Sequence, residues 1–218
     1  MTTFWTDPAT ALAWADGDSQ RDLLALPRAI AAEVIAGEES EVLRIVDIAS
    51  GPGAFLATFL EAFPEALGLW TDISEPLENL ARTSLEPYGD RVDYRICDMT
   101  ALGDLPFNVD VIITSRASHH LNRTELHAFY RDAAGHLAPG GWLVNLDHVG
   151  AQDGWDSRLR RARSRLVPQH HPQVTHHHNY PLTSIDDHLS GLSGSGLIDI
   201  EMPWRAFITC LFIARRAI

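Results

Sequence analysis

The chain has 218 residues, a length that fits one domain with a sizeable hydrophobic core. Acidic residues outnumber basic ones by 29 to 17, and the net charge of −12 disfavours nucleic acid as a substrate because it repels phosphate backbones. All 17 basic residues are Arg, and the absence of Lys excludes Schiff-base chemistry and a phosphate-binding P-loop lysine.

The first 41 residues have the pattern of a helical cap. Asp7 and Pro8 form a typical helix start, because Pro is well tolerated in the first turn. A second helix is predicted from about Gln20. Its apolar residues recur at helical spacing, at Leu23, Leu26, Ile30 and Val34. We therefore expect residues 1–41 to form an N-terminal helical cap.

Short apolar runs alternate with amphipathic stretches from residue 42 onwards. The runs that predict strands are 42–48, 66–71, 92–97, 109–114 and 142–146. The stretches that predict helices are 54–63, 75–84 and 124–137. Strands rich in Val, Ile and Leu that alternate with helices are typical of right-handed crossovers. The sequence therefore predicts a mostly parallel sheet over residues 42–148.

Two further apolar runs, 197–202 and 206–214, are separated only by residues 203–205. So short a connection has no room for a crossover helix, and these strands are expected to pair antiparallel. The predicted fold class is therefore α/β. It is a seven-stranded, mostly parallel sheet with helices on both faces and a C-terminal antiparallel β-hairpin over 197–218.

Residues 149–196 are far more than a crossover between two strands needs. Part of this insertion, 155–166, predicts a helix with apolar residues on one face, and 185–192 predicts a second short helix. An insertion at this place lies beside the carboxyl ends of the strands, where open α/β sheets bind ligands. We expect residues 149–196 to be a substrate lid.

A glycine-rich turn over residues 49–53 joins the first predicted strand of the sheet to a helix. Glycines let a backbone approach a ligand closely, and the helix that follows offers free N–H groups. A nicotinamide dinucleotide site would continue from Gly51 and Gly53 to a third small residue, but Leu56 stands there. A nicotinamide-dependent reductase is therefore the less favoured interpretation of this turn.

Carboxylates stand at the ends of the next two predicted strands. Asp72 follows Gly51 by twenty-one residues, where a carboxylate can accept hydrogen bonds from both ribose hydroxyls. Asp98 ends the third strand, where it could accept a hydrogen bond from the exocyclic amine of adenine. Both placements favour an adenosine-containing ligand.

These features together resemble the class I S-adenosylmethionine-dependent methyltransferases, over residues 42–148. The first motif of that family is an acidic residue followed by glycines at alternate positions, and Ala49 replaces its first glycine here. The turn at 137–141 before the fifth strand is also similar to the family pattern. The residues that the resemblance assigns to the S-adenosylmethionine site are Asp47, Ala49, Gly51, Gly53, Asp72, Ile73, Asp98, Met99 and Ser115.

His119 and His120 follow the fourth predicted strand, where the transferred methyl group lies in this family. A neutral imidazole there could take a proton from a hydroxyl or amine substrate. We predict that one of the two assists catalysis; the alternative is that both only line the pocket. Trp14, His148 and Tyr180 are the candidate substrate-binding residues.

Histidines gather at residues 170–178, a spacing that could converge on Zn or Fe. Because the segment reads as a loop that contains proline, we expect these side chains to face solvent or substrate, and no bound metal. The two cysteines lie in apolar runs and are expected to be reduced thiols.

The sequence predicts an enzyme that transfers a methyl group from S-adenosylmethionine to a small-molecule acceptor, at O or N, in biosynthesis. The alternatives are a C-methyltransferase with a His-bound metal and a catalytically silent cofactor-binding partner protein. No apolar stretch is long enough for a membrane span, and the N-terminus lacks the pattern of a signal peptide. We therefore expect a cytoplasmic monomer or homodimer that binds neither nucleic acid nor membranes.

Overall fold

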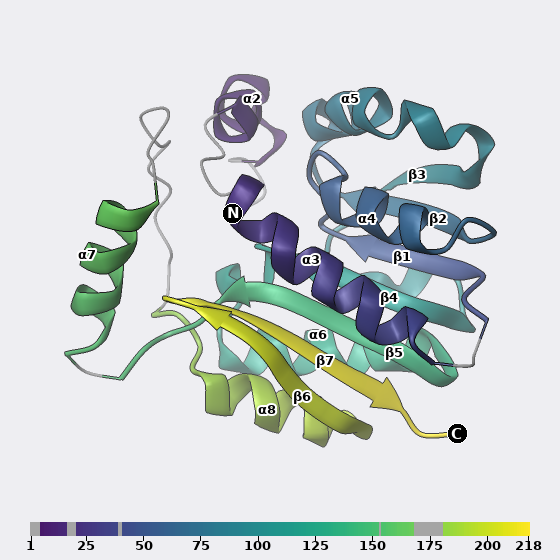
Figure 1. Ribbon diagram of the computed structural model, residues 1–218. Helices are drawn as coiled ribbons and strands as arrows, with labels where there is room; N and C mark the ends of the chain where they lie inside the picture. Colours follow the sequence, from purple (N-terminus) through teal and green to yellow (C-terminus); the bar gives the residue numbers. More distant parts are fainter. Residues whose placement is uncertain (1–4, 17–20, 39–40, 153, 168–180) are drawn as a thin grey trace.

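The protein is described by a computed structural model over residues 5–16, 21–38, 41–152, 154–167 and 181–218. Its centre is a seven-stranded sheet with the strand order β3-β2-β1-β4-β5-β7-β6 (Figure 1). The strands are β1 (Arg44–Ile48), β2 (Leu67–Asp72), β3 (Val92–Ile96), β4 (Val109–Ser115), β5 (Leu137–His148), β6 (Leu197–Ala206) and β7 (Thr209–Arg216). Strands β1 to β5 pair parallel, and β7 is antiparallel to both β5 and β6. The predicted α/β fold class is confirmed.

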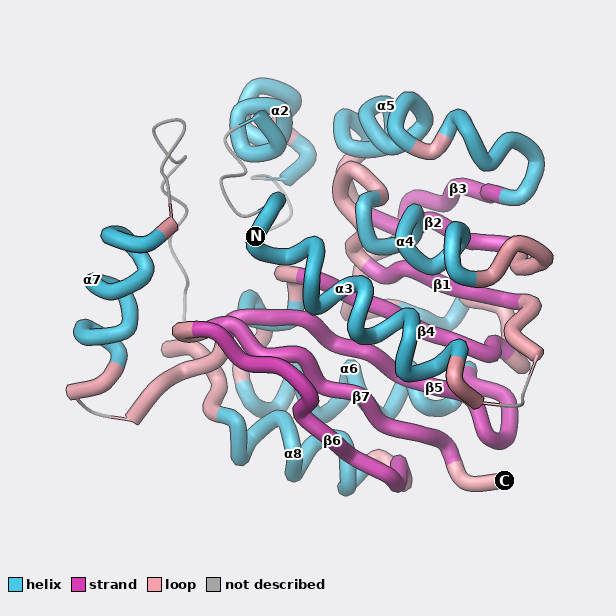
Figure 2. The backbone as a smooth tube through the Cα atoms, viewed as in Figure 1, coloured by secondary structure: helices cyan, strands magenta, loops and turns pink. Residues whose placement is uncertain are grey.

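Helices cover both faces of the sheet (Figures 1 and 2). The α-helices are α2 (Pro8–Asp16), α3 (Arg21–Ala36), α4 (Ala54–Ala62), α5 (Glu75–Ser84), α6 (Arg123–His136), α7 (Asp156–Leu166) and α8 (Ile185–Gly194). The short 3₁₀ helices are η1 (Glu86–Arg91), η2 (Leu102–Asp104) and η3 (Ser118–His120). One apolar core lies under α3, α4 and α5, and a second lies under α6 and α8. No helix among the described residues is long and apolar enough to cross a membrane.

Two helices on the second face begin with capping boxes. Asn122 accepts a hydrogen bond from the Glu125 backbone N–H, while the Glu125 side chain accepts one from the Asn122 N–H. Ser184 and Asp187 make the same reciprocal pair at the start of α8. Each box satisfies N–H groups that have no partner within the helix. The box at Asn122 therefore fixes where α6 begins, directly after the turn η3.

The C-terminal hairpin is confirmed, but its turn is not where the sequence predicted it. Residues 203–205 belong to β6, and the strands reverse at 207–208, with Ala206 paired to Thr209. Phe207 has a positive φ of 55°, which lets the chain turn tightly there. Pro203 is tolerated because β6 is an edge strand, where the missing N–H breaks no ladder on the open side.

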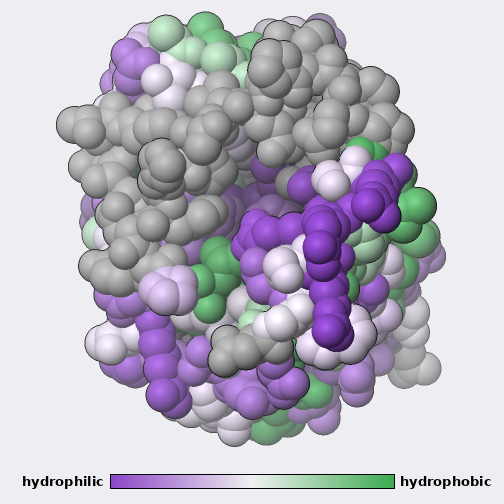
Figure 3. Space-filling model, turned by 90° about the vertical axis from the view of Figure 1, so that its left-hand side faces the viewer, coloured by the Kyte–Doolittle hydropathy of each residue, from purple (hydrophilic) through white to green (hydrophobic). Residues whose placement is uncertain are grey.

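The insertion contains the two helices that the sequence predicted, and they pack differently. Helix α8 packs against α6 and β6, as part of the second face. Helix α7 has no buried residue, and Trp155 and Leu166 of its expected apolar face are 53% and 72% exposed. Figure 3 views the molecule from the side on which α7 lies, and hydrophilic side chains gather there. Whether residues 149–196 act as a lid stays a prediction.

Candidate active site

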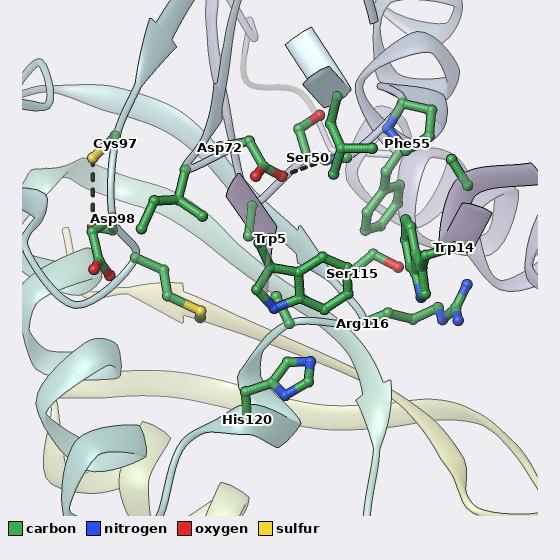
Figure 4. Close-up of a pocket in the computed structure, with 18 of the residues that line it drawn as sticks. Trp5, Trp14, Ser50, Phe55, Asp72, Cys97, Asp98, Ser115, Arg116 and His120 are labelled. Atoms are coloured by element: carbon green, nitrogen blue, oxygen red, sulfur yellow. Dashed lines mark hydrogen bonds between the residues drawn. The ribbon is translucent and has the colours of Figure 1, made fainter. Parts of the chain in front are cut away.

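A pocket of about 320 Å³ opens at the carboxyl ends of the parallel strands. Its wall is formed by the loops after β1, β2, β3 and β4 and by side chains of α2 and α3 (Figure 4). The sequence-predicted site residues that line it are Trp14, Ala49, Gly51, Asp72, Ile73, Asp98, Met99, Ser115 and His120. The structure therefore brings most of the expected cofactor residues and one of the two histidines to a single cavity.

Hydrogen bonds to the buried Asp47 side chain hold the glycine-rich turn after β1 in place. This carboxylate is fully buried and accepts hydrogen bonds from the Ser50 hydroxyl at 2.5 Å and the Leu56 N–H at 3.1 Å. Burial raises the pKa of Asp47 to about 7, against the hydrogen bond from Ser50, which lowers it. Asp47 is therefore not part of the pocket wall, and its contact with the site runs through the turn.

Three residues of this turn have positive φ, namely Ala49 at 54°, Gly51 at 56° and Gly53 at 85°. A Cβ on Gly53 would lie 2.7 Å from Leu85, so this glycine is required by packing and does not line the pocket. Ala49 takes up a left-handed conformation that glycine adopts without strain. The replacement of the family's first glycine by Ala49 therefore leaves backbone strain at the pocket wall.

Asp72 joins the second strand to the glycine turn. Its carboxylate accepts hydrogen bonds from the Gly51 N–H at 2.9 Å and the Ser74 N–H at 3.0 Å, and it faces the pocket. Burial raises the pKa of Asp72 to about 6, although these backbone hydrogen bonds lower it. Each carboxylate oxygen keeps a second lone pair, so Asp72 can still accept hydrogen bonds from a ligand.

The loop after β3 forms the other end of the pocket wall, with Cys97, Asp98, Met99 and Thr100. The Asp98 carboxylate accepts hydrogen bonds from the Thr100 N–H at 2.9 Å and from its hydroxyl at 2.8 Å. These bonds use the Oδ1 atom and hold the side chain beside the cavity. Cys97 and Cys210 are free thiols, as expected.

The two histidines of η3 are placed differently. His120 lines the pocket, and its ring lies 5.6 Å from the Trp5 ring in an edge-on contact. His119 is buried, and its Nδ1 atom lies 2.6 Å from Asp147 Oδ1. The two imidazole rings are 4.2 Å apart. His120 is therefore the histidine that can touch a ligand, and His119 lies behind it.

Asp147, at the end of β5, is a buried residue that the sequence analysis did not assign to the site. Its Oδ2 atom accepts hydrogen bonds from the Ala117 N–H, the Ser118 hydroxyl and the His119 N–H. Its Oδ1 atom accepts from the His148 N–H at 2.7 Å. Burial alone would raise the pKa of Asp147, but its interaction with His119 and these donors hold it well below its ordinary value. The carboxylate is therefore ionised.

Of the expected substrate-binding residues that the structure describes, His148 is not at the pocket wall. His148 is half-buried, and its Nδ1 atom lies 3.0 Å from the Thr209 hydroxyl. Burial holds the pKa of His148 well below its ordinary value. Tyr180 and the histidines of 170–178 lie outside the described residues. Within the described part of the chain, no three His, Cys, Asp or Glu side chains are grouped so that they could hold a metal ion.

Two arginines of the pocket were missed by the sequence analysis, and they lie in one wall with Trp5 and Trp14. Arg28 of α3 and Arg116, which follows β4, line the cavity, and Arg116 lies 5.0 Å from the Trp14 ring centre. Trp5 lies near the centre of the view in Figure 4, beside Trp14 and 5.3 Å from it. Arg116 could have been predicted because it follows Ser115, which had been assigned to the site. In the sequence, Arg28 cannot be distinguished from an ordinary helix residue.

The fold and the site define an α/β domain that binds a ligand at the carboxyl ends of its parallel strands. The sequence profile of a methyltransferase domain family matches residues 45–141. Residues 45–141 therefore belong to a methyltransferase domain, and the family inferred from the sequence is confirmed. No curated protein matches the sequence.

Solved structures of methyltransferases share this fold. An O-methyltransferase family protein from Burkholderia thailandensis has 18% identity and a TM-score of 0.71, over 99% of this chain and 62% of its own. The mitomycin 7-O-methyltransferase MmcR has 22% identity and a TM-score of 0.69, over 97% and 58%. The phosphoethanolamine N-methyltransferase 2 of Haemonchus contortus, solved with S-adenosylhomocysteine, has 14% identity and a TM-score of 0.67, over 97% and 58%. The chain thus spans less than two thirds of the length of each of these proteins.

Proposed function

We propose that this protein transfers a methyl group from S-adenosylmethionine to a small-molecule acceptor. The observation that carries the proposal is that one cavity joins the glycine turn and the carboxylate Asp72 to the imidazole of His120. A cofactor site and a candidate base therefore face the same space. The acceptor atom is expected to be O or N, and we include a role in biosynthesis in the same proposal.

The residues present fit the cofactor. Asp72 would accept hydrogen bonds from ribose hydroxyls, and Asp98 would accept one from the adenine amine. Among the described residues, the buried Ser115 Oγ atom at the pocket has no hydrogen-bond partner, so a polar ligand group would satisfy it. When bound, the cofactor supplies a methyl group on a sulfonium centre, which is already a strong electrophile.

The tasks left to the protein are to position the acceptor, to exclude water and to receive one proton. His120 stands at the pocket wall, where an imidazole nitrogen can take the proton from an O–H or N–H group of the acceptor. Trp5 and Trp14 cover the cavity with apolar surface, which limits water. The small size of the cavity and the net charge of −12 favour a small acceptor over nucleic acid.

Calorimetry with S-adenosylmethionine, S-adenosylhomocysteine and NADH tests the cofactor assignment. Binding of the first two ligands without NADH is the expected result, and NADH binding alone would contradict it. Transfer of labelled methyl groups to a panel of phenols, amines and acidic carbon compounds then tests turnover. A protein that binds the cofactor but methylates no acceptor in such a panel, alone or with metal ions added, would fit the silent partner better.

A further inference from the structure

A branched chain of buried hydrogen bonds runs behind the histidine turn η3. The Asn145 side chain lies on β5 with its Nδ2 atom 2.8 Å from Ser118 Oγ and 2.7 Å from the Tyr130 hydroxyl. Ser118 Oγ in turn lies 2.7 Å from Asp147 Oδ2. All four residues are buried, so their hydrogen bonds are not exchanged with solvent.

The second branch leads away from the pocket. The Tyr130 hydroxyl lies 2.6 Å from His188 Nδ1, and His188 Nε2 lies 3.1 Å from the Thr183 hydroxyl. Thr183 is next to the bridge that pairs Gly150 with Ser184. This branch therefore ties the core to the end of the insertion, and none of these hydrogen bonds involves Asp147.

The ionised carboxylate of Asp147 fixes the direction of every bond in the chain. Because Asp147 can only accept, the hydroxyl hydrogen of Ser118 must point to it. Ser118 Oγ then accepts from Asn145, whose second N–H points to the Tyr130 oxygen. Tyr130 is left to donate to His188 Nδ1, so His188 carries its hydrogen on Nε2.

The same argument assigns the ring of His119. With an ionised carboxylate 2.6 Å from Nδ1, this nitrogen must carry a hydrogen. Asp147 thus binds η3 and the residue before it at four points, namely the N–H groups of Ala117 and His119, the Ser118 hydroxyl and the His119 ring. His120 is the next residue along the turn, so its position depends on this anchor.

We propose that Asp147, braced by Asn145 through Ser118, is the positioning residue that holds the His120 ring at the pocket wall. His119 then attaches the turn to Asp147, and His120 is the group that touches the acceptor. The chain braces the turn and does not conduct protons, because the Asn145 amide donates in both directions and has no labile proton to pass on. This inference rests on the proposed function, in which His120 takes the proton.

The branch point supplies a matched pair of variants. Ser118→Ala removes a donor to Asp147 and breaks the branch toward the pocket, while Tyr130→Phe removes one hydroxyl from the opposite branch. Both leave one N–H of Asn145 without its acceptor, so both are expected to lower the unfolding midpoint. Asp147→Asn, which keeps the shape of the side chain, is a third variant.

Each variant is measured for cofactor affinity and for the single-turnover rate of methyl transfer, at a temperature where it is fully folded. Removing an orienting partner of this kind is expected to slow Ser118→Ala and Asp147→Asn by about ten- to a hundredfold. Their cofactor affinity should stay within a few-fold of the wild type, and Tyr130→Phe should keep the wild-type rate. The proposal would be overturned if Ser118→Ala and Asp147→Asn kept the wild-type rate. It would also be overturned if Tyr130→Phe lost as much rate as these two variants.

Histidine-ring NMR of the cofactor-free protein separates this inference from the proposed function. Long-range ¹H–¹⁵N spectra, assigned with His119→Asn, should show His119 with its hydrogen on Nδ1 in the wild type and a changed ring signal in Asp147→Asn. If the wild-type His119 ring carries its hydrogen on Nε2 instead, the proposed contact with Asp147 is wrong, whatever the activity. Absence of cofactor binding in a protein with the expected ring signal contradicts the proposed function instead.

Discussion

Cofactor binding should be coupled to the ionisation of Asp72. In the free protein, burial raises the pKa of this carboxyl to about 6, so it is protonated in a large share of molecules below that pH. Two ribose hydroxyls that both donate hydrogen bonds require the carboxylate form. Binding near pH 6 should therefore release a proton from Asp72, and affinity should fall as the pH is lowered.

The size of the effect follows from the pKa alone. If only the ionised form binds, the dissociation constant rises about tenfold for each pH unit below the pKa. Between pH 7 and pH 5, a carboxyl with a pKa of about 6 therefore weakens binding by about tenfold, or about 1.4 kcal/mol. A carboxyl with the ordinary pKa of about 3.9 would change the affinity by less than about 10% over the same range.

The assay is titration calorimetry with S-adenosylhomocysteine at pH 5, 6 and 7, in buffers of different ionisation enthalpy. The matched control is Asp72→Asn, which keeps the shape but cannot titrate, and which should bind more weakly at pH 7 by about 1.5–3 kcal/mol for the lost charge-assisted bonds. Any pH dependence from other groups remains in this variant. If the wild type and Asp72→Asn show the same pH dependence, Asp72 is not the coupled group and the placement of the ribose is wrong.

Three further changes test the site. His120→Asn should lower the single-turnover rate by ~10²–10⁴-fold at unchanged cofactor affinity, and an unchanged rate would show that the ring only lines the pocket. Ala49→Gly should relieve left-handed strain and raise the free energy of unfolding in urea by about 0.5–1 kcal/mol, since the strain relieved exceeds the entropy cost of glycine. The pKa of Asp47 is about 7 in the folded protein and about 3.9 when unfolded, so the folded state binds more protons and its contribution to stability is lost as pH rises through this window. Urea unfolding should therefore show that Asp47→Asn loses less stability than the wild type between pH 4 and about 7, and equal slopes would contradict the assignment.

The core of the fold could be predicted because each of its strands and helices has a recognisable local pattern of residues. The strands of the parallel sheet are short apolar runs, and the start of α6 is marked by Asn122 and Glu125 three residues apart. The hairpin turn was misplaced because Pro203 reads as a break, whereas an edge strand tolerates it. Tertiary context decided this position, since the same tripeptide in a central strand would have ended it.

The cofactor half of the site was also readable, because parallel strands end at one edge of the sheet and carry their functional residues there. Asp72 and Asp98 were found in this way, and both line the pocket. Asp47 was assigned to the same set, but its side chain points below the glycine turn and is fully buried. Position in a motif predicts the place of a residue along the chain and does not tell which side of the backbone its side chain occupies.

The role of Asp147 could not be predicted from the sequence, because most of its hydrogen-bond donors are distant along the chain. Its immediate neighbours Leu146 and His148 say only that a carboxylate stands at the end of an apolar run. Apart from the His148 N–H, the partners that make it a buried anion lie twenty-eight to thirty residues earlier in the sequence, on the turn after β4. A buried carboxylate is stable only when donors surround it, so the donors had to be located in space before the residue could be given a role. The same requirement makes Asp147→Asn the most informative substitution, because it removes the charge that orders the turn while keeping the shape that fills the site.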